Sequence, residues 1–261
     1  MKILLSEWMK TKRTPVRWIT FLTPVIFAAL IVWYFSFRTI TADTQISIFE
    51  AFFEVWATMV IPVGAGLIPG IMIHQEELAG CFNGFLGSKL PRRDLYVGKF
   101  IMLALLASVS TLLGVLALII GSSLFLRISV SWSIFLRAAI MAMIGTLPLL
   151  AFHLWISLAW GMGASIGIGS GGILIAALMA TSLGDQIWPF VPWAWPVRLS
   201  LLTGAELLDL TGMNLPSSVM VSDYITSQAV KGFIPAAVLF AVLLSGGLIW
   251  FQKWEGRKLT D

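Results

Sequence analysis

The sequence is poor in charged residues and in cysteine. Only 11% of its 261 residues are Asp, Glu, Lys or Arg, against roughly 25% in ordinary soluble domains. Its single cysteine, Cys81, makes an intrachain disulfide impossible. Hydrophobic residues instead make up 58% of the chain, and the mean hydropathy is +0.92. One soluble core cannot bury that much apolar surface in a chain of this length, so the composition predicts an integral membrane protein.

Motifs of covalent chemistry are also missing. The sequence has no HExxH, GxSxG or Walker A pattern, and its two histidines, His74 and His153, fall on different predicted spans. For His153, in mid-span, a hydrogen-bonded packing role is favoured over a proton relay. Asp185 follows a span end, but no second membrane-embedded aspartate is there to form a catalytic carboxylate pair. We therefore expect no catalytic, cofactor-binding or metal-binding residues, and no ATP hydrolysis by this chain.

Six long apolar stretches are present, each close to the length of about 20 residues that crosses a bilayer as a helix. They cover residues 16–37, 51–74, 100–125, 134–160, 165–183 and 232–251. We therefore expect an all-α integral membrane protein, in which an N-terminal amphipathic interfacial helix precedes six transmembrane helices. The whole chain, residues 1–261, is predicted to form a single transmembrane domain.

Residues 1–14 are predicted to lie along the membrane surface. Leu4, Leu5 and Trp8 share one side of this stretch, while its basic residues lie largely elsewhere and suit anionic lipid headgroups. A cleaved signal peptide is the rival interpretation. The mixture of acidic and basic residues, followed by a long apolar segment, favours a retained anchor.

The distribution of basic residues predicts the orientation in the membrane. If the N-terminus is cytoplasmic, most of the 17 Lys and Arg residues fall at the termini and in residues 75–99, as the positive-inside rule requires. Both termini and residues 75–99 are therefore expected in the cytoplasm, and residues 184–231 outside. The net charge of +4 then reflects cytoplasmic loops, and no nucleic-acid partner is expected.

The polar stretch 75–99 is the strongest candidate for a functional site. Its acidic start, apolar middle and basic end predict a short helix from Gln75 to Phe85, ended by Gly87 and Pro91. The apolar side chains of this helix would either dock on a partner protein or lie against the bilayer surface, and docking is favoured. The candidate docking residues are Glu76, Glu77, Phe82, Phe85, Leu86, Arg92 and Arg93.

The predicted outer loop is rich in tryptophan and proline. The run WPFVPWAWPVR covers Trp188–Arg198, and tryptophan is enriched at membrane–water interfaces. The apolar stretch Leu199–Leu210 is too short to span and is predicted to be a re-entrant or interfacial helix. The loop is either a lid anchored by its aromatic rings or a place where an amphipathic substrate is received or released. The residues concerned are Trp188, Trp193, Trp195, Arg198 and Glu206.

Glycine and proline mark two of the spans. In the fifth, Gly163, Gly167 and Gly171 have the spacing of close helix contacts, whereas the overlapping GxGxxG pattern lacks the βαβ unit that a dinucleotide site needs. Helix packing is therefore the favoured interpretation. In the second, Pro62 and Pro69 predict a kink or a break.

Two segments resemble those of a known family. The opening LLSEWMKTKRT is similar to the "xxxExxKxxR" run found near the N-terminus of type-2 ABC exporter (ABC-2) permeases. The stretch HQEELAGCFNGFLGSKLPRRDLYVGKF is similar to the coupling segment of these proteins, with its acidic start, small apolar helix and Pro-Arg pair followed by a lysine. With PWAWPVR in the outer loop, the chain most resembles the permeases of lantibiotic self-immunity exporters and their bacitracin-resistance relatives.

The resemblance implies an ABC-2 permease fold in a bacterial cytoplasmic membrane. It implies that two permease subunits, identical or homologous, pair with a dimer of cytoplasmic ABC ATPase subunits, which would bind the ATP and Mg. The coupling helix would dock on an ATPase, and ATP-driven closure would expel an amphipathic peptide from the bilayer.

Three other functions compete with export. One is a non-transporting immunity or sensor protein that binds antimicrobial peptide, and another is the binding subunit of an uptake system. The third, a membrane enzyme, is disfavoured because the sequence lacks clustered polar residues.

Overall fold

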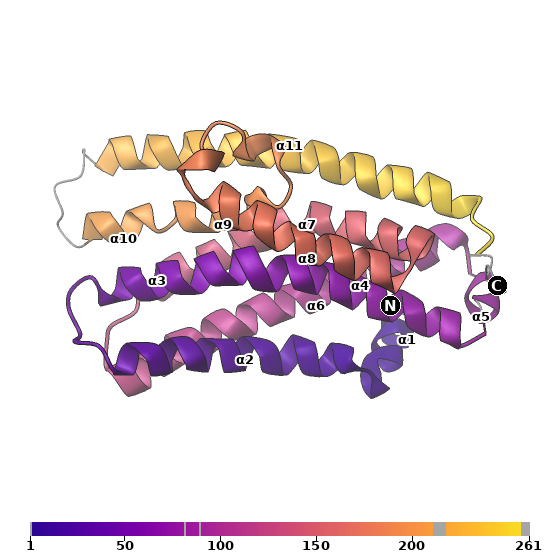
Figure 1. The fold of residues 1–261 in the computed structure, drawn as a ribbon, viewed down its shortest axis with the longest axis horizontal. Coiled ribbons are helices and arrows are strands. Elements are labelled where there is room, and N and C mark those ends of the chain that lie inside the picture. Colours follow the sequence, from indigo (N-terminus) through magenta and orange to yellow (C-terminus); the bar gives the residue numbers. More distant parts are fainter. Residues whose placement is uncertain (1, 81, 89, 211–217, 257–261) are drawn as a thin grey trace.

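The computed structural model describes residues 2–80, 82–88, 90–210 and 218–256 as a bundle of helices that run roughly along one axis (Figure 1). Cys81 and residues 211–217 of the predicted outer loop lie outside this description. No strand occurs within the described ranges. The α-helices are α1 (Lys2–Lys10), α2 (Pro15–Ser36), α3 (Thr44–Val55), α4 (Ile61–Leu78), α5 (Asn83–Leu86), α6 (Arg92–Gly121), α7 (Trp132–Trp160), α8 (Met162–Ala180), α9 (Ala194–Leu202), α10 (Ala205–Leu210) and α11 (Ser218–Gln252).

Within the part of the chain that the structure describes, six helical segments are long and apolar enough to cross a membrane, which confirms the predicted all-α fold with six spans. They are Pro15–Ser36, Thr44–Leu78, Arg92–Leu126, Trp132–Trp160, Met162–Ala180 and Ser222–Gln252. The second and third are 35 residues long and extend past the predicted ends. The last helix, α11, begins at Ser218, so part of the predicted loop 184–231 is helical.

The outer surface of the bundle is apolar, as a bilayer requires. On α2 the exposed large side chains recur every three or four positions, which is one side of a helix. They include Trp18, Leu22, Ile26, Leu30 and Trp33. Its buried residues recur on the opposite side, which packs against α6. A largely apolar helix can therefore give one face to protein and the other to lipid.

The second span is a continuous helix, and a π-turn comes directly before its first proline, Pro62. Residues Trp56–Val60 form this turn between α3 and α4, and the Ile61 N–H donates to the Trp56 carbonyl five residues earlier. Pro62 has no N–H to donate, so in a regular helix it would leave one carbonyl without its hydrogen bond. The wider π-turn comes directly before this proline. Pro69 lies inside α4 without interrupting it. The prolines therefore do not break this span.

Two helices approach closely where glycine faces glycine. A Cβ added at Gly66 of α4 would lie 3.2 Å from the Gly169 Cα, and one added at Gly169 of α8 would lie 3.0 Å from the Gly66 Cα. The predicted helix packing of α8 is therefore present, but on a different face. Around Gly163, Gly167 and Gly171 there is open space, so the prediction that these three make the close contacts is wrong.

His153 joins three helices within the bundle. It is fully buried on α7, and its Nδ1 lies 3.1 Å from the Ser165 Oγ on α8. The Ser165 hydroxyl in turn donates to the Gly66 carbonyl on α4 at 2.8 Å. These contacts support the predicted packing role of His153.

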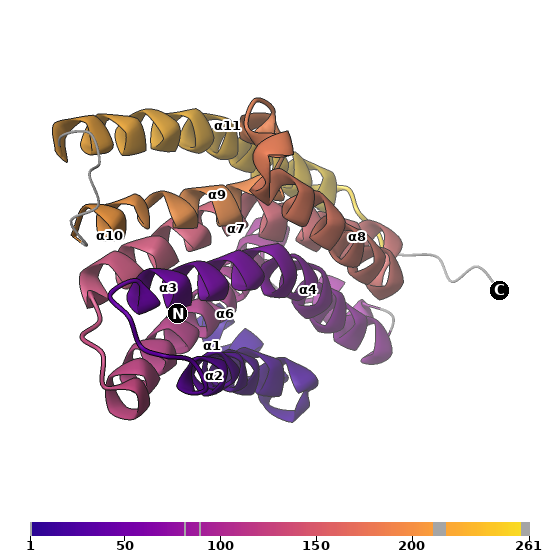
Figure 2. The ribbon, with the colours of Figure 1, turned by 60° about the vertical axis from the view of Figure 1, so that its left-hand side comes forward.

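The spans are not packed evenly. Helix α2 packs mainly on α6, whereas α4 packs mainly on α8 and α7, and α7 also contacts α9 and α11. Figures 1 and 2 show α2 along one side of the bundle and α11 along the opposite side, with α4 and α8 between them. Contacts between α4 and either member of the α2–α6 pair are sparse. The bundle is therefore loosest between α4 and the α2–α6 pair, whereas α6 packs well on α7.

Candidate functional site

Two carboxylates and two ammonium groups from distant parts of the chain meet at the end of the bundle that carries α5. This charged cluster consists of Glu7, Lys10, Glu76 and Lys99. The Lys99 Nζ lies 2.8 Å from a carboxylate oxygen of Glu7 and 2.8 Å from one of Glu76. The Lys10 Nζ lies 2.8 Å from Glu7 and 2.6 Å from Glu76. Lys99 is 1% exposed, so its charge depends on these partners.

The sequence of α1 explains how the cluster forms. Glu7 and Lys10 are three positions apart, so both point to the same side of the helix, toward α6. Burial opposes the charge on Lys10, but hydrogen bonds to Glu7 and Glu76 outweigh it, so the pKa of Lys10 is raised above its ordinary value. Two negative and two positive groups balance, and the cluster ties α1, α4 and α6 into one unit.

The predicted helix from Gln75 to Phe85 is wrong as a continuous element. Helix α4 extends to Leu78, so the two acidic residues of this stretch lie at the end of a long helix and not at the start of a short one. The chain then turns through Gly80 and Phe82, which have φ values of 121° and 65°. The separate helix α5 spans only Asn83–Leu86. Lysine partners from α1 and α6 allow Glu76 to lie at an unfavourable helix terminus.

The other residues predicted for docking differ in their accessibility. Phe82 is 2% exposed and packs edge-on against Trp254, with ring centroids 5.0 Å apart. Arg92 donates to the carbonyl oxygens of Gln252, the last residue of α11, and of Trp254, two residues beyond it. Arg93 is exposed. Phe82 and Arg92 therefore attach α5 and the start of α6 to the chain after α11.

The remaining candidates lie around this turn. Glu77 has its carboxylate 3.1 Å from the His74 Nδ1, and Leu86 is half-buried. The side chain of Phe85 lies outside the described part of the chain. The exposed apolar side chains at this end include Leu78 and Leu90, which are 73% and 45% exposed. Sequence reasoning counted Leu78 among the apolar residues of this stretch, but placed neither leucine among the docking candidates.

The tryptophans of the predicted outer loop point into the bundle. Trp188 and Trp195 are 4% and 1% exposed, and the Trp195 indole N–H donates to the Pro189 carbonyl at 2.9 Å. Trp193 is half-buried, and its ring occupies the space where a side chain on Gly172 of α8 would lie. These rings anchor the loop on the bundle.

The apolar stretch after the tryptophans forms two helices instead of the single predicted one from Leu199 to Leu210. Helix α9 already begins at Ala194 and packs on α7, where a Cβ added at Gly145 would lie 2.8 Å from the Pro196 nitrogen. Helix α10 follows after a turn at Thr203 and Gly204.

Two ion pairs fix this region to neighbouring helices. Arg198 donates to the Met179 and Thr181 carbonyl oxygens at 2.6 Å each, and one of its nitrogens lies 2.8 Å from the Asp185 carboxylate. Glu206 pairs with Arg137 of α7. Arg198 therefore satisfies carbonyl groups at the end of α8 that have no partner within that helix.

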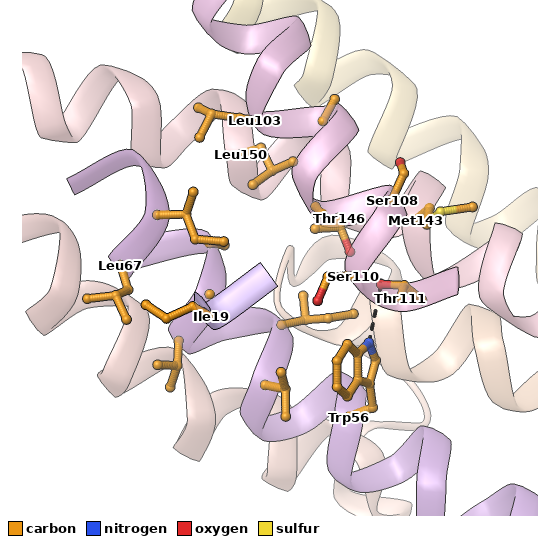
Figure 3. Close-up of a pocket in the computed structure, with 18 of the residues that line it drawn as sticks. Ile19, Trp56, Leu67, Leu103, Ser108, Ser110, Thr111, Met143, Thr146 and Leu150 are labelled. Carbon is orange, nitrogen blue, oxygen red and sulfur yellow. Dashed lines mark hydrogen bonds between the residues drawn. The ribbon is translucent and has the colours of Figure 1, made fainter. Parts of the chain in front are cut away.

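A cavity of about 340 Å³ lies between α2, α4, α6 and α7, where the bundle is loosest. Trp56 is at one end, with its indole N–H donated to the Thr111 hydroxyl at 3.3 Å, and Leu103 and Leu150 are at the other (Figure 3). Its wall includes Gly64 of α4, and no charged residue lines it. Sequence reasoning missed this cavity.

These features define a class of protein: a helical membrane protein whose surface helix is joined to its second and third spans by buried charges. Residues 3–168, more than half of the chain, match the family described as ABC-2 family transporter protein, and the chain belongs to this family. No curated protein matches the chain. The protein is thus a transmembrane permease subunit of an ABC transporter, which associates with an ABC ATPase.

Proposed function

We propose that this permease exports an amphipathic peptide of the lantibiotic type, or another hydrophobic compound, from the membrane to the outside. In this proposal both termini and α5 face the cytoplasm of a bacterial cell, and the permease acts with a second permease subunit, identical or homologous. The chain would bind neither ATP nor Mg itself. Immunity or resistance to the peptide would follow from its removal from the bilayer.

The observation that carries the proposal is the charged cluster beside α5. Its ion pairs join α1, α4 and α6, so a displacement applied at the turn between α4 and α6 would move three helices together. The exposed Leu78, next to that turn, offers apolar contact to a partner protein, and the exposed Arg93 offers a charge at its rim. This geometry suits the transmission of work from an ATPase.

The sequence analysis placed Phe82 among the residues that contact the partner protein, but in this proposal it has a structural role. Because it is buried against Trp254, it would hold α5 in position instead of entering the partner. Substitution of Phe82 would then still uncouple the ATPase, through loss of position and not through loss of contact.

The test is a double variant, Phe82→Ala with Phe85→Ala, co-expressed with the partner ABC ATPase. We expect normal membrane insertion, continued ATP hydrolysis and loss of the ATP-driven transport of a fluorescently labelled lantibiotic into the lumen of inside-out vesicles, where the lumen corresponds to the outside of the cell. A matched control, Leu22→Ala with Leu30→Ala on the exposed face of α2, should export normally. Unchanged export by the Phe82/Phe85 variant at normal expression would refute the coupling role.

A further inference from the structure

The cavity between α2, α4, α6 and α7 lies entirely within the spans. Its lining residues come from four membrane-spanning helices, and it is only partly enclosed. Met59 lines it and is 49% exposed. A ligand would therefore reach it from the hydrocarbon region of the bilayer.

The chemistry of the wall is apolar. No charged residue lines the cavity, and the few polar side chains are Ser and Thr. Two of these hydroxyls have partners in the protein: Thr111 accepts from the Trp56 indole, and Thr146 donates to the Ala142 carbonyl at 2.6 Å. A charged group placed inside would lose its hydration without gaining a counter-ion. The occupant must therefore be uncharged along the buried part.

The size of the cavity restricts the occupant further. About 340 Å³ is at the lower end of the range of roughly 300–1,000 Å³ that is usual for small-molecule sites. It is too small for a folded peptide. Small residues on the facing helices, Gly64 on α4 with Ala104 and Ala107 on α6, leave room for a narrow chain.

We propose that this cavity binds one hydrocarbon chain of a membrane lipid, whose headgroup stays at the membrane surface. The chain would fill the space between the α2–α6 pair and α4 within a single subunit. This site does not depend on the proposed function, because binding of a lipid chain requires neither ATP nor an exported peptide.

Gly64 provides a sharp test. A Cβ added at this position meets no atom within 4 Å, and Gly64 lines the cavity, so a larger side chain here would extend into the empty space. Leucine also favours the helix more than glycine does. Gly64→Leu should therefore fold normally and occupy the place of the lipid chain. Gly246→Leu on α11 is the matched control, because it too meets open space but lies outside the cavity.

The experiment uses the full chain in nanodiscs that contain phosphatidylglycerol with a diazirine near the end of one acyl chain. After irradiation, mass spectrometry should find labelled residues in the cavity wall, around Met59 and Leu67, and on the exposed face of α2. We expect Gly64→Leu to lose the cavity labels and to keep those on α2, while Gly246→Leu keeps both.

A second probe, a diazirine-bearing free fatty acid, distinguishes the source of the chain. Cavity labelling by both probes supports a site that recognises the chain alone, and labelling only by the phospholipid supports a chain tethered by its headgroup. Should Gly64→Leu fail to fold, Ala104→Leu closes the same space from α6. Equal labelling of the cavity wall in the wild type and a folded filling variant, or no labelling of the wall in the wild type, overturns the proposal.

Discussion

Lys99 and Glu7 lie 92 positions apart in the sequence, yet the Lys99 Nζ is 2.8 Å from a Glu7 carboxylate oxygen. This contact holds the surface helix α1 against the start of the third span. It also gives the N-terminal segment a fixed place in the bundle, which an amphipathic helix bound only to lipid headgroups would not have.

We predict that Lys99→Met destabilises the protein much more than Lys10→Met does. Removal of Lys99 leaves buried carboxylates with one partner fewer, and breaking a buried ion pair typically costs about 3–5 kcal/mol. The Lys10 side chain is 42% exposed, so its loss should cost about 1 kcal/mol or less. Thermal unfolding of the two variants in detergent measures the difference. Equal melting temperatures would show that the cluster does not act as described.

The contact between α4 and α8 predicts opposite effects for two glycines of one helix. A Cβ at Gly169 would lie 2.7 Å from the Pro62 carbonyl oxygen, which is backbone and cannot easily move. Gly169→Ala should therefore destabilise by about 1–3 kcal/mol through overpacking. Gly167→Ala meets open space and should be neutral or stabilising by up to about 1 kcal/mol. Melting curves in one detergent compare them, and a larger loss for Gly167→Ala would contradict the observed face.

Phe82→Ala should loosen the turn that carries α5 without unfolding the spans. It removes a buried ring that packs on Trp254, and burial of such a ring is worth roughly 3–5 kcal/mol in a protein core. Amide hydrogen exchange should accelerate in residues 82–88 and 250–256 and stay unchanged in α7. Leu78→Ala is the control, because Leu78 is exposed and its truncation should leave exchange unaltered. Protection of both segments in Phe82→Ala would argue against the anchoring role.

Arg198→Lys should release the segment that follows α8, although it keeps the positive charge. A lysine cannot reproduce the forked contacts with the Met179 and Thr181 carbonyls and the Asp185 carboxylate. We expect faster hydrogen exchange in residues 181–198. Asp185→Asn should have a smaller effect, because the Asp185 side chain is 59% exposed and the carbonyl contacts remain. The reverse order would mean that the ion pair, and not the carbonyl contacts, holds the segment.

The spans could be predicted from the sequence because the bilayer imposes a length on each of them. Long apolar stretches reveal such helices whatever their neighbours are. The direction that each helix faces was not predictable in the same way. Helix α8 has small or apolar side chains on every side. Nothing in its own sequence therefore distinguishes Gly169, which contacts α4, from Gly167, which does not.

The position of the candidate site in the chain could be predicted from the sequence, but the contacts of its side chains could not. The polar stretch 75–99 was found because it interrupts apolar sequence, and its charges were interpreted by the local rule that acids favour helix starts. Glu76 departs from this rule because Lys10 and Lys99, which are remote in sequence, supply its counter-charges. Phe82 is buried for a similar reason: its neighbour, Trp254, comes from the far end of the chain.

The π-turn at Trp56–Val60 makes the second span intolerant of a change in length. A regular α-helix rotates by roughly 100° per residue, since it has 3.6 residues per turn. Deleting one residue there would restore ordinary winding but swing everything beyond it around the axis, carrying Gly66 away from Gly169 while Phe52 kept its orientation. The extra residue of the π-turn therefore sets the rotation of α4 relative to α3, so that the two halves of one membrane span contact different neighbouring helices.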